Sequence, residues 1–133
     1  MAFGDLFGKR SKRFVAPEET RRKLARQLET NEALVGKLAS AGVSPEDDFR
    51  VEYYFYADEV HKAKLLASDL ARLGYEVEYR ASSKREGQTI VTGWTTPMSL
   101  SLPTVNGWTE HMSQLGLKYD CDFDGWGAGS IGA

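Results

Sequence analysis

The fold is decided around residues 49–56, whose sequence is Phe-Arg-Val-Glu-Tyr-Tyr-Phe-Tyr. Every second residue from Phe49 to Phe55 is a large apolar or aromatic one, whereas the residues between them include Arg50 and Glu52. Successive side chains of a strand point to opposite faces, so this alternation predicts a strand with one buried and one solvent-facing side. Tyr54 and Tyr56 then lie on the solvent-facing side.

The neighbouring segments alternate between helical and strand patterns. Pro17 followed by two glutamates opens a helix that Gly42 ends, and Asp58 is a suitable N-cap for a second helix that ends at Gly74. A third helix is expected from Ser99 or Ser101 to Gly116. Further strands are predicted at residues 75–80, 88–94 and 117–124.

After the first helix the predicted order is therefore β-α-β-β-α-β. This order favours an α+β, ferredoxin-like sandwich, in which two helices cover one face of a four-stranded antiparallel sheet. Right-handed crossovers place the first and third strands at its centre. We accordingly expect four regions, which are a basic N-terminal segment (1–16), an extra helix (17–42), a ferredoxin-like domain (48–128) and a Gly-rich tail (129–133).

The amino-acid composition and the distribution of charge exclude several classes of protein. The 133 residues contain 17 Lys and Arg against 19 Asp and Glu, for a net charge of −2. Residues 1–29 have eight bases and four acids, whereas residues 30–133 have nine bases and fifteen acids. A lone cysteine, Cys121, excludes an intrachain disulfide and suits a reducing cytoplasm, and no apolar run reaches the length of a membrane helix.

Three sequence patterns resemble phosphate-binding, calcium-binding or metal-ligand motifs, but each lacks residues or a spacing that such a site needs. Residues 127–132 match G-x-G-x-x-G, but a phosphate-binding glycine loop needs a helix after it, and one residue follows Gly132. Residues 120–125 match the front of a calcium loop whose twelfth position, Ile131, lacks the required glutamate. His61 and His111 have no metal-ligand spacing, and exposed helix positions are expected for both. We therefore predict no enzyme, catalytic residue, cofactor or metal.

The predicted uncovered face of the sheet is rich in carboxylates and poor in bases. Its acids are expected to be Glu52, Glu76, Glu78, Asp120 and Asp122, and its bases Arg50, Arg80 and Lys118. Such a face repels phosphates and favours a basic protein segment. An RNA-binding module that uses the basic N-terminal segment and the sheet tyrosines remains the alternative.

Three stretches together resemble the regulator of ribonuclease E activity B family. They are residues 51–58, the Leu-Gly-Tyr-Glu-Val sequence at 73–77, and the acidic segment that ends in Asp-Gly-Trp-Gly at 124–127. The resemblance implies a small, non-catalytic, cytoplasmic bacterial protein of ferredoxin-like fold. It also implies binding to ribonuclease E, through that enzyme's Arg-rich scaffold region, and inhibition of RNA processing.

The candidate partner-binding residues follow from the acidic face together with the last strand. They are Glu52, Tyr54, Tyr56, Glu76, Glu78, Asp120, Asp122, Asp124 and Trp126. For Trp126, closure of the sheet edge is the alternative role. For Tyr54 and Tyr56, contact with a second copy of the chain in a homodimer is the alternative.

Overall fold

The computed structural model describes residues 13–127. Within them lie the helices α2 (Pro17–Ser40), α3 (Val60–Arg72) and α4 (Leu102–Tyr119). The strands are β1 (Asp48–Phe49), β2 (Glu52–Ala57), β3 (Glu76–Ala81), β4 (Thr89–Trp94), β5 (Met98–Ser99) and β6 (Asp122–Gly127). The predicted α+β class is confirmed. The expected tail at 129–133 and most of the basic segment 1–16 lie outside the described residues.

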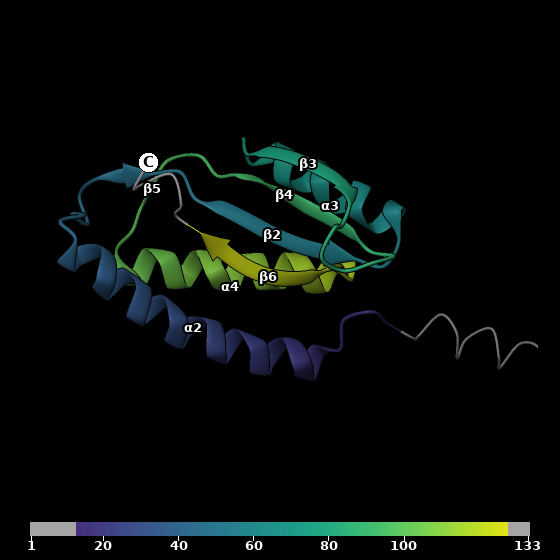
Figure 1. Ribbon diagram of the computed structural model, residues 1–133, viewed down its shortest axis with the longest axis horizontal. Helices are drawn as coiled ribbons and strands as arrows, with labels where there is room; N and C mark the ends of the chain where they lie inside the picture. The colour runs from purple at the N-terminus through teal and green to yellow at the C-terminus, as the bar shows by residue number, and fades with distance from the viewer. Residues whose placement is uncertain (1–12, 128–133) are drawn as a thin grey trace, which may run out of the picture.

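The main sheet has the strand order β3-β4-β2-β6, and each neighbouring pair is antiparallel. The central strands are β2 and β4, which are the first and third of the four predicted strands. Helices α3 and α4 lie behind the sheet, and α2 runs beside α4 and the edge strand β6 (Figure 1). The other side of the main sheet, opposite α3 and α4, is called the open face below.

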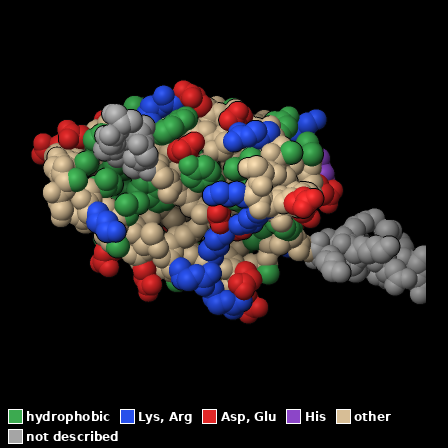
Figure 2. All heavy atoms as spheres, viewed as in Figure 1, with side chains coloured by type: hydrophobic (Ala, Val, Ile, Leu, Met, Phe, Trp, Pro, Cys, Tyr) green, Lys and Arg blue, Asp and Glu red, His purple; other side chains and the backbone are tan. Residues whose placement is uncertain are grey.

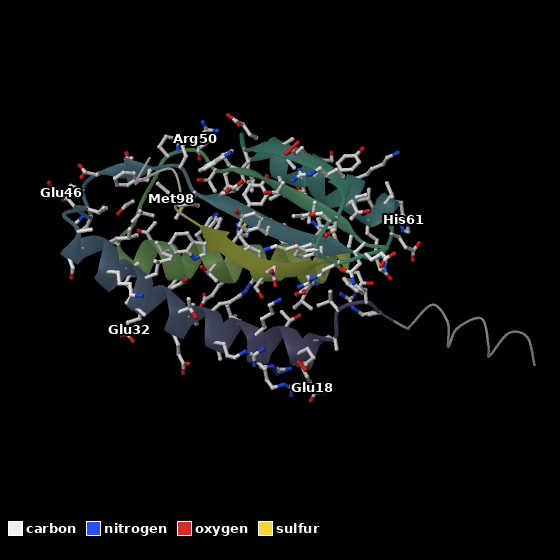
Figure 3. All side chains as sticks on the ribbon, in the orientation of Figure 1. Glu18, Glu32, Glu46, Arg50, His61 and Met98 are labelled. Atoms are coloured by element: carbon white, nitrogen blue, oxygen red, sulfur yellow. The ribbon has the colours of Figure 1, made fainter. Side chains whose placement is uncertain are left out.

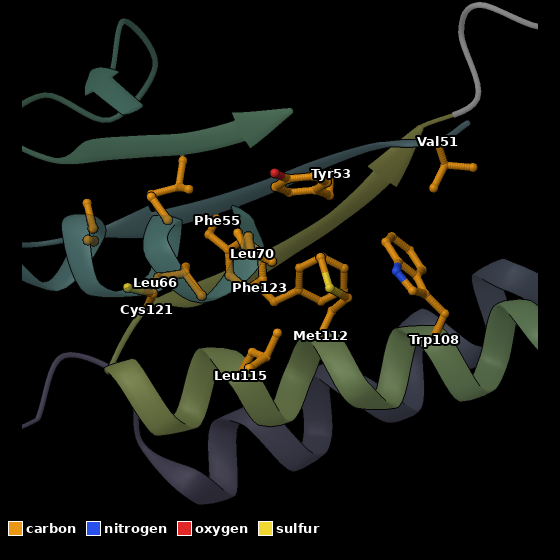
Figure 4. Packing of buried hydrophobic residues seen from close by; sticks show 14 of the residues in the cluster. Val51, Tyr53, Phe55, Leu66, Leu70, Trp108, Met112, Leu115, Cys121 and Phe123 are labelled. Atoms are coloured by element: carbon orange, nitrogen blue, oxygen red, sulfur yellow. The ribbon is translucent and has the colours of Figure 1, made fainter. Parts of the chain in front are cut away.

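The core fills the space between the sheet and the two helices behind it. Phe55 of β2 is fully buried, and so are Leu66 of α3 and Met112 of α4 (Figure 4). The ring of Phe55 lies 5.0 Å from that of Phe123 on β6. Burying a side chain of this size stabilises a fold by about 1.5–3 kcal/mol, so this layer holds the sheet against the helices.

Gly93 of β4 allows the neighbouring strand β3 to lie close to it. Tyr53, which faces the core, donates its hydroxyl hydrogen bond to the Glu76 carbonyl oxygen at 2.6 Å, across Gly93. A Cβ at Gly93 would lie 1.8 Å from that oxygen. Any other residue there would therefore push β3 away from β4.

Helix α2, whose place the sequence left open, is fastened by a buried asparagine. Asn31 is 1% exposed, and its amide donates to Asn106 and Thr109 of α4 at 3.1 and 2.9 Å. The same side chain accepts a bond from the Trp126 indole nitrogen at 2.8 Å. One buried polar side chain thus joins α2 to α4 and β6, and its hydrogen bonds offset the cost of its burial.

The prediction of one continuous strand at residues 49–56 is wrong in its first part. Residues 48–49 form β1, which pairs with β5 in a separate two-stranded sheet that the sequence did not predict. Val51 then donates its N–H to the Thr95 hydroxyl at 3.0 Å, and Thr95 donates its own N–H to the Val51 carbonyl at 2.9 Å. These two hydrogen bonds lie just before the start of β2. The N-cap of α3 is Glu59 and not the predicted Asp58.

The predicted last strand also begins in the wrong place. Helix α4 continues past Gly116 to Tyr119, and Asp120 ends it in a left-handed conformation (φ 59°). The returning chain passes so close that a Cβ at Gly116 would lie 2.6 Å from the Cys121 carbonyl oxygen. Gly116 therefore permits close packing rather than ending the helix, and residues 117–119 do not belong to the strand.

Candidate partner-binding surface

The open face consists of three rows of side chains that cross β3, β4 and β2 in register. The rows are Glu76–Trp94–Glu52, Glu78–Thr92–Tyr54 and Arg80–Ile90–Tyr56. Figure 2, in the same view as Figure 1, shows acidic, basic and hydrophobic side chains intermixed over these strands. The open face therefore carries basic and apolar side chains beside its carboxylates.

The carboxylates of the first two rows remain accessible. The side chains of Glu76 and Glu78 are 64% and 65% exposed, and they pair with Arg50 and Arg80 of the same chain. Glu52 accepts the hydroxyl hydrogen bond of Tyr54 at 2.7 Å. Burial and this bond to Glu52 raise the pKa of Tyr54 to about 12, so its hydroxyl stays protonated at neutral pH.

Tyr56 lies on the open face but is 4% exposed. The guanidinium carbon of Arg85, from the loop between β3 and β4, lies 3.9 Å from the centre of the Tyr56 ring. This is the geometry of a cation–π contact. The stacked arginine leaves less aromatic surface for an RNA base or a second copy of the chain than the sequence suggested.

Asp122 and Asp124 are paired with cations of their own chain. Lys23 of α2 lies 3.0 and 2.8 Å from their oxygens, and Arg85 lies 3.0 and 3.1 Å from them. We call these four residues the charge clamp. It ties α2 and the β3–β4 loop to β6, so its two carboxylates are largely neutralised.

Asp120 is not on the open face. Its carboxylate accepts the N–H groups of Phe14 and Val15 at 3.0 and 2.8 Å and the Lys62 ammonium of α3 at 2.7 Å. Burial acts to raise the pKa of Asp120, but the bonds from Lys62 and the two N–H groups outweigh it and hold that pKa below its ordinary value. Its placement on the uncovered face is a wrong prediction, because Asp120 caps α4.

Trp126 projects toward the helices. Besides its bond to Asn31, its ring stands edge-on to Trp108 of α4 at 6.4 Å. Asn31 and Trp108 thus hold the indole at the rim of the core. This geometry matches the alternative role, closure of the sheet edge.

The described residues contain little that resembles catalytic or metal-binding machinery. His61 and His111 are exposed, as predicted, and Figure 3 shows His61 at the end of the molecule away from Arg50 and Met98. In residues 13–127 no group of three or more His, Cys, Asp or Glu is placed to hold a metal ion. Burial raises the pKa of the Cys121 thiol to about 12, which leaves it unreactive.

Three cations that neutralise carboxylates of the predicted surface could not be found from the sequence. Lys23, Lys62 and Arg85 each pair with a carboxylate distant in sequence, and no local pattern reveals such pairs. Trp94 could have been found, because Ile90, Thr92 and Trp94 alternate along one strand. None of the helices in the described part of the chain has the length and apolar character to cross a membrane.

These features define a small α+β protein whose candidate site is an exposed, charged and aromatic sheet face. The chain belongs to the regulator of ribonuclease activity B family, whose model matches residues 28–128. It is 27% identical over 106 residues to the regulator of ribonuclease activity B of Salmonella typhi, covering 78% of this chain and 77% of that one.

Two further relatives carry the same name. The protein of Escherichia coli (strain K12) is 26% identical over 106 residues, with 78% of this chain and 77% of the relative covered. That of Aeromonas hydrophila is 29% identical over 101 residues, with 74% and 88% covered. The family expected from the residues at 51–58, 73–77 and 124–127 is therefore confirmed, and the protein belongs to a family of bacterial ribonuclease regulators.

Proposed function

We propose that this protein is a non-catalytic regulator that binds ribonuclease E and lowers its RNA processing. Family membership supports the regulatory role. The observation that carries the binding mode is the accessible acidic end of the open face, formed by Glu52, Glu76 and Glu78. A basic scaffold segment of the enzyme is the complementary partner, because opposite potentials steer association and fix its orientation.

The proposal concentrates the contact on fewer residues than the nine predicted from sequence. The clamp carboxylates Asp122 and Asp124 and the helix cap Asp120 already have cations of this chain beside them. The pairs made by Glu76 and Glu78 are exposed, and such pairs are worth about 0–1 kcal/mol, so a partner's cations replace them at little cost.

The strand order β3-β4-β2-β6, with α3 and α4 on one side, supports a ferredoxin-like domain over residues 48–128. We propose that α2 is an addition to this domain and that it stiffens the edge strand β6. The site then lies on the side of the sheet that α2, α3 and α4, the helices of residues 13–127, leave uncovered.

The test uses purified full-length ribonuclease E and an RNA substrate. We expect the protein to slow cleavage by the full-length enzyme and to leave the isolated catalytic part unaffected. A variant with Glu52→Gln, Glu76→Gln and Glu78→Gln should lose at least about tenfold in inhibitory potency, which corresponds to about 1.4 kcal/mol.

The matched control carries Glu18→Gln, Glu29→Gln and Glu32→Gln on α2. These glutamates are exposed, and Figure 3 shows Glu18 and Glu32 on the side of α2 away from the sheet. Both variants change the net charge equally. Equal inhibition by the two variants would contradict the proposed surface, and inhibition abolished by nuclease treatment of the protein preparation would favour RNA binding.

A further inference from the structure

Two adjoining hollows lie on the open face. The first, of about 330 Å³, is lined by Glu52, Glu76, Glu78, Thr92 and Trp94, together with the backbone beside them. The second, of about 480 Å³, extends toward the β3–β4 loop. Their linings are neighbours at the middle row, where Thr92 lines the first hollow and its register partner Tyr54 lines the second.

The first hollow has the chemistry of a guanidinium site. Glu52, Glu76 and Glu78 line it, and so does Trp94, whose indole is the aromatic ring that attracts a cation most strongly. Arg50 and Arg80 already place guanidinium groups against Glu76 and Glu78 from the outside. A planar fork with several donors fits such a set of carboxylates better than a lysine ammonium does.

Thr92 supplies an independent sign of a ligand there. It is 4% exposed, and among the described residues its hydroxyl oxygen has no hydrogen-bond partner. A buried polar atom without a partner is uncommon and calls for a physical reason. A donor that enters the first hollow would supply the missing bond.

The second hollow has different walls. Tyr54 and Ile90 line it with aromatic and apolar surface, and Arg80, Lys84 and the carboxylate of Asp124 line it as well. Lys23 and Arg85 already neutralise Asp124, so Arg80 and Lys84 disfavour a second basic residue there. A large aliphatic or aromatic side chain therefore suits this hollow.

The strand geometry sets the distance between the two hollows. Thr92 and Ile90 are two residues apart on β4, which corresponds to about 7 Å along a strand. An extended segment also projects side chains to one side at every second residue, with nearly the same spacing.

We propose that the open face binds an extended segment in which an arginine and a large apolar residue are two positions apart. The arginine enters the first hollow beside Thr92, and the apolar side chain enters the second hollow beside Ile90. This inference rests on the proposed function for the basic character of the partner and adds the sequence pattern that the partner must carry.

The test measures binding of synthetic peptides to the purified full-length protein by calorimetry. All peptides have equal net charge and contain Arg-x-Leu, Arg-x-x-Leu or Arg-x-Ser in a lysine-containing background. We expect Arg-x-Leu to bind at least about tenfold more tightly than the other two. Replacing its arginine by lysine should weaken binding about threefold or more.

Thr92→Val is the decisive variant, because it keeps the side-chain shape and removes the hydroxyl without a partner. The variant should fold at least as stably as the wild type, yet bind the Arg-x-Leu peptide more weakly by about threefold or more. Glu32→Gln on α2 serves as the control and should bind as the wild type does. If the peptide contacts the face elsewhere, Thr92→Val changes nothing and the inference is overturned.

The outcomes separate this inference from the proposed function. Equal affinity for all three peptides, or tighter binding of a single-stranded RNA of the same length, would overturn the arginine-and-apolar pattern even if ribonuclease E is inhibited. Selective binding of Arg-x-Leu by a protein that does not affect ribonuclease E would support the pattern and reject the enzyme as the partner.

Discussion

Two groups of carboxylates in this protein have the same chemistry and different surroundings. Asp120 sits between α4 and β6, where backbone N–H groups and Lys62 fill its hydrogen-bonding capacity, and its side chain is 15% exposed. Glu76 and Glu78 stand on the open face with single, exposed arginine partners. The first group holds parts of the chain together, whereas the second is available to a partner.

The comparison shows that acidity alone does not mark a binding surface. What matters is whether cations and N–H groups of the same chain already neutralise the carboxylate. Asp122 and Asp124 illustrate the intermediate case, because the charge clamp neutralises them although Asp124 is exposed. A carboxylate already held by several donors gains little from a partner's cation.

The largest effect is expected at Asp120. Asp120→Ala removes the acceptor of two N–H groups and of Lys62 and places an alanine at φ 59°. Hydrogen bonds to charged groups contribute about 1.5–3 kcal/mol each, but water replaces most of these three bonds at so shallow a site, and a left-handed alanine costs a further ~1 kcal/mol. We expect the free energy of unfolding to fall by about 2–4 kcal/mol in urea titrations.

Asp120→Asn is the matched control, because asparagine tolerates the left-handed conformation and keeps one acceptor oxygen. It should lose about half as much stability as Asp120→Ala. If both variants unfold at the urea concentration of the wild type, the division between the two groups of carboxylates is wrong.

The alternation at residues 49–56 identified the fold class, because burial of one side of a strand leaves a direct mark on the sequence. The central position of β2 and β4 followed from connection rules. The path of residues 116–121 could not be predicted, since the pattern of Leu117, Tyr119 and Cys121 suits a strand, while the close approach at Gly116 that keeps the helix going is a tertiary contact.

The same limit applies to the candidate site. Glu52, Glu76 and Glu78 could be placed on the open face because strand periodicity alone decides their direction. Tyr56 was placed on the correct face too, yet the arginine that covers it comes from a loop with no periodicity. Loop and helix side chains that reach across the sheet therefore decided which predicted residues stayed accessible.

A smaller effect is expected in the pH dependence of the free energy of unfolding, to which Asp120 contributes. The folded-state pKa of Asp120 is below its ordinary value, so the stabilisation is fully present above the ordinary carboxyl pKa. It is lost as the pH falls from there through the folded-state pKa. Between about pH 6 and pH 3 the wild type should lose more stability than Asp120→Asn does. Equal losses of stability in the wild type and in Asp120→Asn would contradict the role given to Asp120.

The smallest effect on stability is expected from the variant with Glu52→Gln, Glu76→Gln and Glu78→Gln. It changes the formal net charge from −2 to +1, which is a large electrostatic change for so short a chain. Exposed pairs contribute little, and a glutamine at position 52 still accepts the Tyr54 hydroxyl, so each substitution should shift the free energy of unfolding by less than about 0.5 kcal/mol. Urea unfolding beside the inhibition assay checks both quantities on the same sample. If stability is retained and inhibition is lost, these carboxylates act in binding. A loss of stability as large as that of Asp120→Ala would instead show that the open face, like the region around Asp120, holds the fold together.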